Sequence, residues 1–262
     1  MPSKVRILFI GDIVGSPGRA ALADALPILK REISPHFILA NGENAAGGYG
    51  LTEKVAEDLL ALGIDVLTSG NHIWRREFLG YLDRAERVVR PANYPEEAPG
   101  RGAVIISKED FTLGVINLEG RVFMRSIECP FRVGRRLAAE MYQKTPLILV
   151  DFHAEATSEK MALSYYLDGR VTAVVGTHTH VQTADEKILP GGTAYITDVG
   201  MTGVRDSVIG MRKDQALELF LSQVPRKLEV PKKGASILEA VLVEADSQSG
   251  RALSIVRLRK FL

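Results

Sequence analysis

The segment 171–180, with the sequence VTAVVGTHTH, constrains the fold more than any other part of this chain. Its β-branched apolar run, 171–175, predicts a buried strand that Gly176 ends, so the next residues lie on a loop at the strand's carboxyl end. Open α/β sheets bind their ligands at this edge. His178 and His180 can both reach one metal site there, or one each of two neighbouring metals. Alone, such a pair more often marks surface or hydrogen-bonded histidines, so its meaning depends on partners elsewhere.

Other short apolar runs end in polar loops in the same way. Runs at 5–10, 37–40 and 66–69 predict three strands, with helices between them at 20–32 and after Thr52. This order predicts right-handed βαβ units in an α/β fold. Further strands are predicted at 147–150 and 195–197, further helices at 158–167 and 215–224, and a closing antiparallel hairpin at 236–244 and 252–259.

Length and composition predict a single globular domain over residues 1–262, which is long enough for a sizeable core. The 33 basic and 32 acidic side chains give a net charge of +1, which argues against a surface that coats a polyanion. The single cysteine, Cys129, cannot form an internal disulfide. The apolar run at 5–10 is too short for a membrane span or a signal peptide. We therefore expect a cytoplasmic protein with no membrane partner.

The middle of the chain has a less regular pattern. Residues 90–102 are rich in proline and glycine and predict a long loop. A hairpin of strands at 104–107 and 113–117 is predicted after it. Residues 121–143 begin without a clear period and continue as a basic helical pattern, which predicts a small cap insertion over the core.

Residue types that bind metals gather in the loops that follow the predicted strands. They are Asp12, Glu43, Asn44, Asn71, His72, His153, His178 and His180. Four of the 5 histidines fall in these loops, whereas His36 precedes a strand and is expected on the surface. Mixed oxygen and nitrogen donors suit manganese, iron or zinc better than a thiolate site would. The combined pattern therefore indicates a metal centre more strongly than any single motif.

Glu43 is the candidate bridge, because a carboxylate can join two ions about 3.5–4 Å apart, a device known from phosphoester chemistry. One ion would then take Asp12 and His180, and the other Asn71, His153 and His178. A simpler interpretation remains open, in which Asp12 and Asn44 cap turns and Glu43 is a solvated loop charge.

Five motifs in order along the chain carry a family resemblance. They are GDIVG, NGENAAGG, GNHIW, DFHAEATSEK and GTHTH, between Val5 and about Gly203. This series resembles the YmdB-like branch of the calcineurin-like metallophosphoesterase superfamily. The superfamily more often begins with Asp-x-His and bridges its metals with an aspartate, whereas this chain has Asp12-Ile13-Val14 and Glu43-Asn44. Both departures agree with the YmdB-like branch.

The resemblance implies a fold, a ligand set and an activity. The fold is a two-sheet β-sandwich flanked by helices, with a small cap. Two divalent ions, iron or manganese before zinc, would bind between the loops. The first ion would be surrounded by Asp12, Glu43, Asn44 and His180, and the second by Glu43, Asn71, His153 and His178, with His72 as proton donor. The implied reaction is hydrolysis of cyclic nucleotides, above all of 2′,3′-cyclic mononucleotides to 3′-nucleotides.

Two other functions stay open at this stage. One is a phosphomonoesterase acting on nucleotides or phosphoproteins, and the other is a slow or non-catalytic regulator that binds a nucleotide or RNA. Arg19 and Arg205 are weaker candidates for phosphate contacts, and Tyr49 for stacking on a base, since surface arginines and a flexible glycine-rich loop are simpler explanations. The sequence leaves the assembly state open and is compatible with a homo-oligomer.

Overall fold

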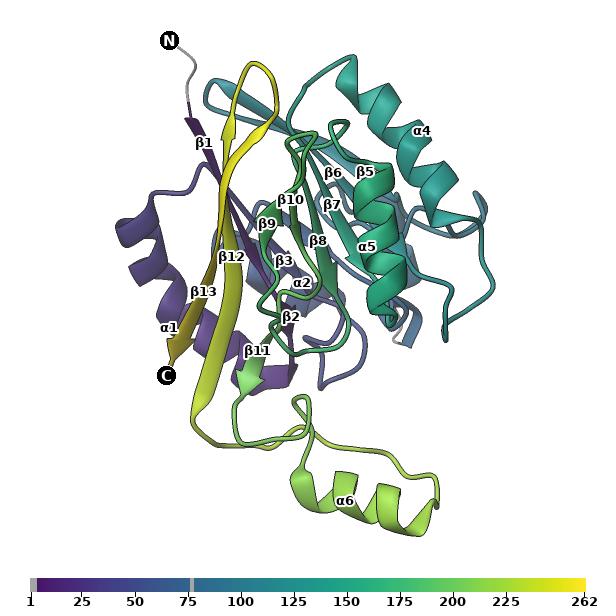
Figure 1. The fold of residues 1–262 in the computed structure, drawn as a ribbon. Helices are drawn as coiled ribbons and strands as arrows, with labels where there is room; N and C mark the ends of the chain where they lie inside the picture. Colours follow the sequence, from purple (N-terminus) through teal and green to yellow (C-terminus); the bar gives the residue numbers. More distant parts are fainter. Residues whose placement is uncertain (1–3, 76–77) are drawn as a thin grey trace.

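Side chains of the first strand alternate between two hydrophobic clusters, one on each face of its sheet. In a computed structural model, which describes residues 4–75 and 78–262, strand β1 (Lys4–Ile10) is buried on both faces. Ile7 and Phe9 point into a cluster shared with the second sheet, while Leu8 and Ile10 point into a cluster shared with helices. One strand therefore contributes to two cores, which places its sheet in the interior of the molecule (Figure 1).

The first sheet joins the two ends of the chain. Its order is β2 (Asp12–Ile13), β11 (Met201–Val204), β12 (Ser236–Asp246), β1, β3 (Phe37–Asn41) and β4 (Val66–Thr68), and β13 (Ala252–Phe261) pairs with β12. Strands β1, β3 and β4 are parallel, as the sequence predicts. The predicted closing hairpin is formed by β12 and β13, and β12 pairs antiparallel with β1.

The second sheet is built from the middle of the chain. Its order is β5 (Ala103–Lys108), β6 (Phe111–Glu119), β7 (Ile148–His153), β8 (Ala173–Thr177), β10 (Ala194–Ile196) and β9 (Lys187–Ile188). The predicted hairpin is formed by β5 and β6, and the strands from β6 through β7 and β8 to β10 are parallel. Apolar residues from both sheets, such as Phe37 and Leu149, form the core between them.

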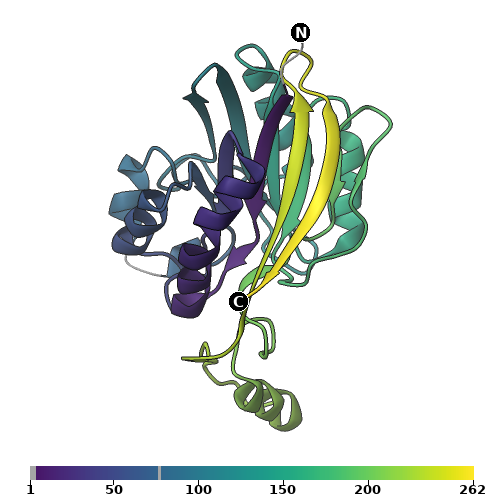
Figure 2. The same cartoon turned by 90° about the vertical axis from the view of Figure 1, so that its left-hand side faces the viewer.

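Helices cover the outer faces of both sheets. The first sheet carries α1 (Gly15–Ile33), α2 (Glu53–Ala61) and α3 (Leu79–Arg84), and the second carries α4 (Pro130–Tyr142) and α5 (Thr157–Tyr166). Helix α2 begins where predicted, because the Thr52 hydroxyl accepts a hydrogen bond from the Val55 amide at 3.4 Å. The predicted two-sheet sandwich flanked by helices is thereby confirmed (Figure 2). Within the described segments, no helix has both the length and the apolarity required to cross a membrane.

Two segments lie at the margins of the sandwich. Residues 121–143, for which the sequence predicts a cap, contain α4, which packs on the outer face of the second sheet through Val133 and Ala138. A different helix, α6 (Lys213–Ser222), projects beyond one end of the sandwich in both views (Figures 1 and 2). Leu217 and Phe220 of α6 are exposed apolar side chains.

Two predicted boundaries were wrong, and close backbone packing explains both. Strand β8 continues through Gly176 and Thr177. Gly176 packs closely against a neighbouring segment, because a Cβ at this position would lie 1.8 Å from the Thr197 carbonyl oxygen. Glycine is needed there for close approach and not as a strand breaker. Helix α1 begins at Gly15, within the predicted turn. Pro17 does not prevent this start, because proline is tolerated in the first turn of a helix. Gly18 lets this turn approach β11, where a Cβ would lie 2.2 Å from the Thr202 carbonyl oxygen.

Candidate metal centre

The parallel strands of both sheets end at one end of the sandwich, and their carboxyl ends supply the candidate ligands. Asp12 follows β1, Glu43 and Asn44 follow β3, and Asn71 and His72 follow β4. From the second sheet, His153 ends β7, and His178 and His180 follow β8. The structure thus brings together all of the residues that the sequence predicts for the site, from segments far apart in the chain.

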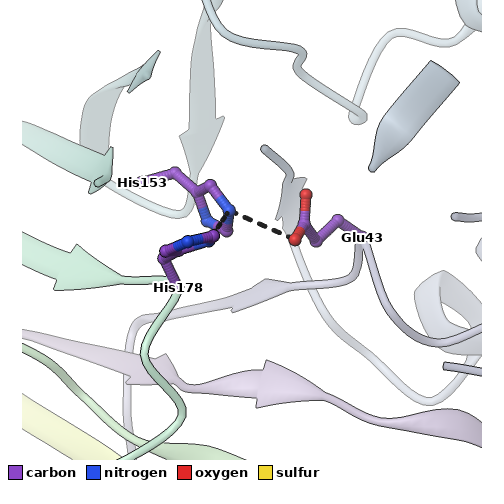
Figure 3. Close-up of side chains that lie close together, drawn as sticks. All are labelled: Glu43, His153 and His178. Atoms are coloured by element: carbon purple, nitrogen blue, oxygen red, sulfur yellow. Dashed lines mark hydrogen bonds and ion pairs between the residues drawn. The ribbon is translucent and has the colours of Figure 1, made fainter. Parts of the chain in front are cut away.

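One half of the site is a cluster of Glu43, His153 and His178 (Figure 3). Their ligand atoms all lie within 4.8 Å of one another. Nε2 of His153 lies 3.2 Å from Oε1 of Glu43 and 2.9 Å from Nδ1 of His178. The Asn71 side-chain oxygen is 3.0 Å from the same Nε2. Four polar groups therefore converge on one point.

The other half of the site is formed by Asp12, Asn44 and His180. Nε2 of His180 lies 3.2 Å from the Asn44 amide nitrogen and 3.6 Å from Oδ1 of Asp12. The same Asn44 nitrogen donates to Oε1 of Glu43 at 3.2 Å. Glu43 therefore contacts both halves of the site, while Asp12 and His180 contact each other within one half.

His72 lies at the edge of this arrangement. Its Nδ1 is 2.8 Å from the Asn44 side-chain oxygen and 3.3 Å from Oε1 of Glu43. Both neighbours are acceptors, so Nδ1 carries a proton and Nε2 lies on the opposite edge of the ring. Its backbone amide also donates to Oε2 of Glu43 at 2.9 Å, and the Tyr49 ring packs edge-on at 5.1 Å between centroids. The imidazole is thus held in place with 21% of its side chain exposed.

In His178 and His180, one ring nitrogen contacts an acceptor outside the site, so the other ring nitrogen faces the site. The Ile209 carbonyl oxygen lies 2.8 Å from Nδ1 of His180, so that nitrogen carries the proton and Nε2 faces Asp12. The Glu155 carboxylate lies 3.2 Å from Nε2 of His178, which leaves Nδ1 facing the cluster. Sequence reasoning missed both acceptors. Glu155 stands within the DFHAEATSEK motif, but a backbone carbonyl such as that of Ile209 leaves no signal in a sequence.

The loop that carries both histidines has a strained backbone. His178 has φ 104° and His180 has φ 63°, a region that non-glycine residues rarely adopt. Buried acceptors hold this conformation. The Asp12 carboxylate accepts the His178 amide at 3.2 Å, and Asp198 accepts the Thr179 amide at 3.1 Å. The backbone strain is therefore offset by charge-assisted hydrogen bonds on both sides of the loop.

A cation fits this arrangement on chemical grounds. Oδ1 of Asp12 is buried and has no hydrogen-bond partner among the described residues, which is costly for a carboxylate oxygen. Two imidazole nitrogens, of His153 and His178, also face each other beside the Glu43 carboxylate. Buried carboxylates and imidazoles that converge in this way match the donor set of a borderline divalent metal. The residues present therefore fit a metal centre.

Charges within the site shift the pKa values of its histidines and acids. Burial lowers the pKa of His153, but Glu43 and Asp12 outweigh it and raise that pKa to about 9. Burial and then the charge of His153 lower the pKa of His178 to about 3. Burial alone would raise the pKa of Glu43, yet the contact with His153 holds it well below its usual value. Without a metal, the site holds ionised acids, a protonated His153 and a neutral His178.

Comparison with known proteins shows the family of this chain. The family described as YmdB-like protein matches residues 8–258 of the chain. The chain belongs to the YmdB-like protein family. A curated relative, the 2′,3′-cyclic-nucleotide 2′-phosphodiesterase of Bacillus subtilis, is 49% identical over 255 residues, which cover 97% of this chain and 96% of that protein.

Two crystal structures are similar to this YmdB-like chain over nearly its full length. A hypothetical protein from Thermus thermophilus has 40% identity and a TM-score of 0.91, over 98% of this chain and 99% of that one. A novel phosphatase from Mycoplasma pneumoniae has 33% identity and a TM-score of 0.93, over 100% of this chain and 95% of that one. The two-sheet sandwich is therefore shared with both of these proteins over nearly the whole chain.

The structure places the weaker candidates in different surroundings. Arg19 donates to the Ala45 carbonyl and so supports the loop next to Asn44. Arg205 lies 5.2 Å from the centre of the Phe261 ring, which pairs it with the last strand. Tyr49 is the one of the three whose ring packs on a predicted site residue, His72. His36 is half-buried and its Nδ1 accepts a hydrogen bond from the Arg6 amide at 3.0 Å, outside the site.

Proposed function

We propose that this YmdB-like protein is a dinuclear, metal-dependent phosphodiesterase that opens 2′,3′-cyclic mononucleotides to 3′-nucleotides. The observation that carries the proposal is the position of Glu43. Its carboxylate contacts His153 in one half of the site, the Asn44 amide that also contacts His180 in the other, and the nearby His72. The near full-length similarity to the Bacillus subtilis phosphodiesterase supports the substrate class.

The chain offers a separate ligand set for each of two divalent cations, with Glu43 common to both. Asp12, Asn44 and His180 would hold one cation, and Asn71, His153 and His178 would hold the other. When bound, such cations supply Lewis acidity toward the phosphate oxygens and toward the attacking water. Oxygen and nitrogen ligands suit iron or manganese, with zinc as a further option.

His72 is the proposed proton donor to the leaving group. Ring opening adds water to phosphorus and breaks the bond between phosphorus and O2′ of the ribose, so O2′ must gain a proton. Asn44 and Glu43 hold the Nδ1–H edge of His72, which leaves Nε2 to deliver the proton to O2′. The product is a 3′-phosphate with a free 2′-hydroxyl.

A product analysis tests this function directly. Purified protein loaded with Mn²⁺ should convert 2′,3′-cyclic AMP to 3′-AMP, as separated from 2′-AMP by chromatography. The double variant His178→Ala, His180→Ala, verified to be metal-free, should be inactive. Full activity in that variant would overturn the metal mechanism. Faster turnover of 3′-AMP or a phosphopeptide than of the cyclic diester, at equal metal occupancy, would favour a phosphomonoesterase, and tight nucleotide or RNA binding without product would favour a regulator.

A further inference from the structure

A buried hydroxyl stands directly behind one of the candidate metal ligands. Thr177 ends β8 and pairs in register with His153 at the end of β7, so both side chains leave the second sheet on the same face. The Thr177 Oγ1 lies 3.0 Å from Nδ1 of His153, on the ring edge that faces away from Glu43. Both residues are 0% exposed, so water does not compete for this contact.

The partners of Thr177 determine the direction of this hydrogen bond. The hydroxyl donates to Oδ1 of Asp151 at 2.8 Å, and a hydroxyl has only one proton to give. The other oxygen of Asp151 is occupied by the Asn41 amide, which donates to it at 3.1 Å. Burial raises the pKa of Asp151 to about 7, so above that pH Asp151 is an acceptor only. Oγ1 of Thr177 can then only accept from His153, and Nδ1 of His153 must carry the proton.

We propose that Thr177, backed by Asp151, is a positioning residue that fixes the Nδ1–H form and the orientation of His153, so that Nε2 is presented to the cation. The inference rests on the proposed function for its metal, although the tautomer itself is a property of the metal-free chain. Nε2 of His153 is the atom that lies against Glu43, Asn71 and His178. Groups that hold the outer nitrogen of a histidine ligand typically contribute about 10- to 100-fold to metal affinity.

A matched pair of threonines separates positioning from simple structural support. Thr193 is also buried and lies just before β10 of the same sheet, where its hydroxyl donates to the Val171 carbonyl at 2.7 Å and accepts the Gly169 amide at 3.0 Å. Thr193→Val removes one donated and one accepted hydrogen bond from a buried hydroxyl. Thr177→Val removes the bond donated to Asp151, the bond accepted from His153 and a longer one accepted from the Asn41 amide at 3.4 Å. Only Thr177 touches a candidate ligand, so only its loss should change metal binding.

The first experiment measures Mn²⁺ affinity and stoichiometry, with urea unfolding of the metal-free proteins. Thr177→Val should weaken one Mn²⁺ by about 10- to 100-fold, while Thr177→Ser, which keeps the hydroxyl, stays near wild type. Thr193→Val should lose stability and keep wild-type affinity. Equal affinity in Thr177→Val and wild type, or equal weakening in Thr193→Val, would overturn the inference. If Thr177→Val does not fold, the smaller Thr177→Ala replaces it with the same expectation.

The second experiment reads the tautomer without any metal. Long-range ¹H–¹⁵N spectra above the His153 pKa of about 9 should show the Nδ1–H form in wild type and in Thr177→Ser. Thr177→Val should lose this preference. An Nε2–H form in the wild-type protein would overturn the inference. Failure of the wild type to bind Mn²⁺ would instead contradict the proposed function, and the spectra would still decide the role of Thr177.

Discussion

Nε2 of His153 lies 2.9 Å from Nδ1 of His178, so two imidazole nitrogens face each other at hydrogen-bond distance in the centre of the site. Only one proton fits between them. Glu43 and Asp12 outweigh burial and raise the pKa of His153 to about 9, whereas burial and then the charge of His153 lower the pKa of His178 to about 3. In the metal-free protein the shared proton occupies the place where both lone pairs converge, and a bound cation must displace it.

Metal affinity should therefore depend on pH through His153. Below its pKa of about 9, the metal-free site carries a proton that binding must release, so Mn²⁺ affinity should rise with pH and level off above about 9. The expected slope is about tenfold per pH unit, for one proton displaced by the cation. Titration calorimetry in two buffers of different ionisation enthalpy at neutral pH should report about one proton released. An affinity that stays constant over this range would contradict the assignment of His153 as a ligand.

A methyl group at Gly70 should dismantle one half of the site. A Cβ there would lie 2.1 Å from Cδ2 of His153, and a buried ring at the end of a strand has little room to move. Gly70→Ala should thus destabilise the fold by about 1–3 kcal/mol and remove one of two bound metals. Gly80→Ala in α3 is the matched control, because a Cβ there meets nothing within 4 Å among the residues that the structure describes. Urea unfolding and metal analysis of both variants check this, and wild-type metal content in Gly70→Ala would disprove it.

Lys160 should stabilise the histidine loop through a buried ion pair. Its Nζ lies 2.8 Å from Oδ2 of Asp198, with side chains 1% and 0% exposed. The same Asp198 oxygen accepts the Thr179 amide between the two loop histidines. Lys160→Met leaves this carboxylate without a counter-charge and should cost about 3–5 kcal/mol in urea unfolding. Lys213→Met, which breaks an exposed pair with Asp206, should have a much smaller effect. Similar losses in both variants would contradict a special role for Lys160.

The ligand positions could be predicted from the sequence because parallel strands share one edge. Each apolar run marks a strand, and the polar residues at or just after its last position must lie at the carboxyl edge of the sheet, as Asp12, Glu43 and His153 do. The closing hairpin was equally predictable, because two alternating segments joined by a short loop form an antiparallel pair, as β12 and β13 do. In both cases, a local pattern determines a position in the sheet.

The supporting contacts could not be predicted, since they depend on which side chains face each other across the fold. Thr177 looks like an ordinary strand residue until the register places it opposite His153. The Ile209 carbonyl approaches His180 from the segment that leads to α6, and every residue has such a carbonyl. Gly176 was misjudged as a strand breaker because a sequence cannot show that the Thr197 carbonyl packs against it.

The role of His72 should depend on the leaving group of the substrate. His72→Ala should lower kcat for 2′,3′-cyclic AMP by about 10²–10⁴-fold, because the departing ribose oxygen needs a proton. Hydrolysis of bis-p-nitrophenyl phosphate should change far less, because its phenolate leaves as a stable anion. Mn²⁺ affinity should stay near wild type, as the backbone amide of residue 72 still donates to Glu43.

The control for this test is His36→Ala, which removes the histidine that lies outside the site and bonds to the Arg6 amide. This variant should hydrolyse both substrates at the wild-type rate. Equal loss on both substrates in His72→Ala would mean that His72 acts on the metals or the attacking water, since neither depends on the leaving group. No loss on either would assign the proton to another donor. Only a loss confined to the cyclic nucleotide fits a proton delivered from Nε2 of His72, the ring edge opposite Asn44 and Glu43.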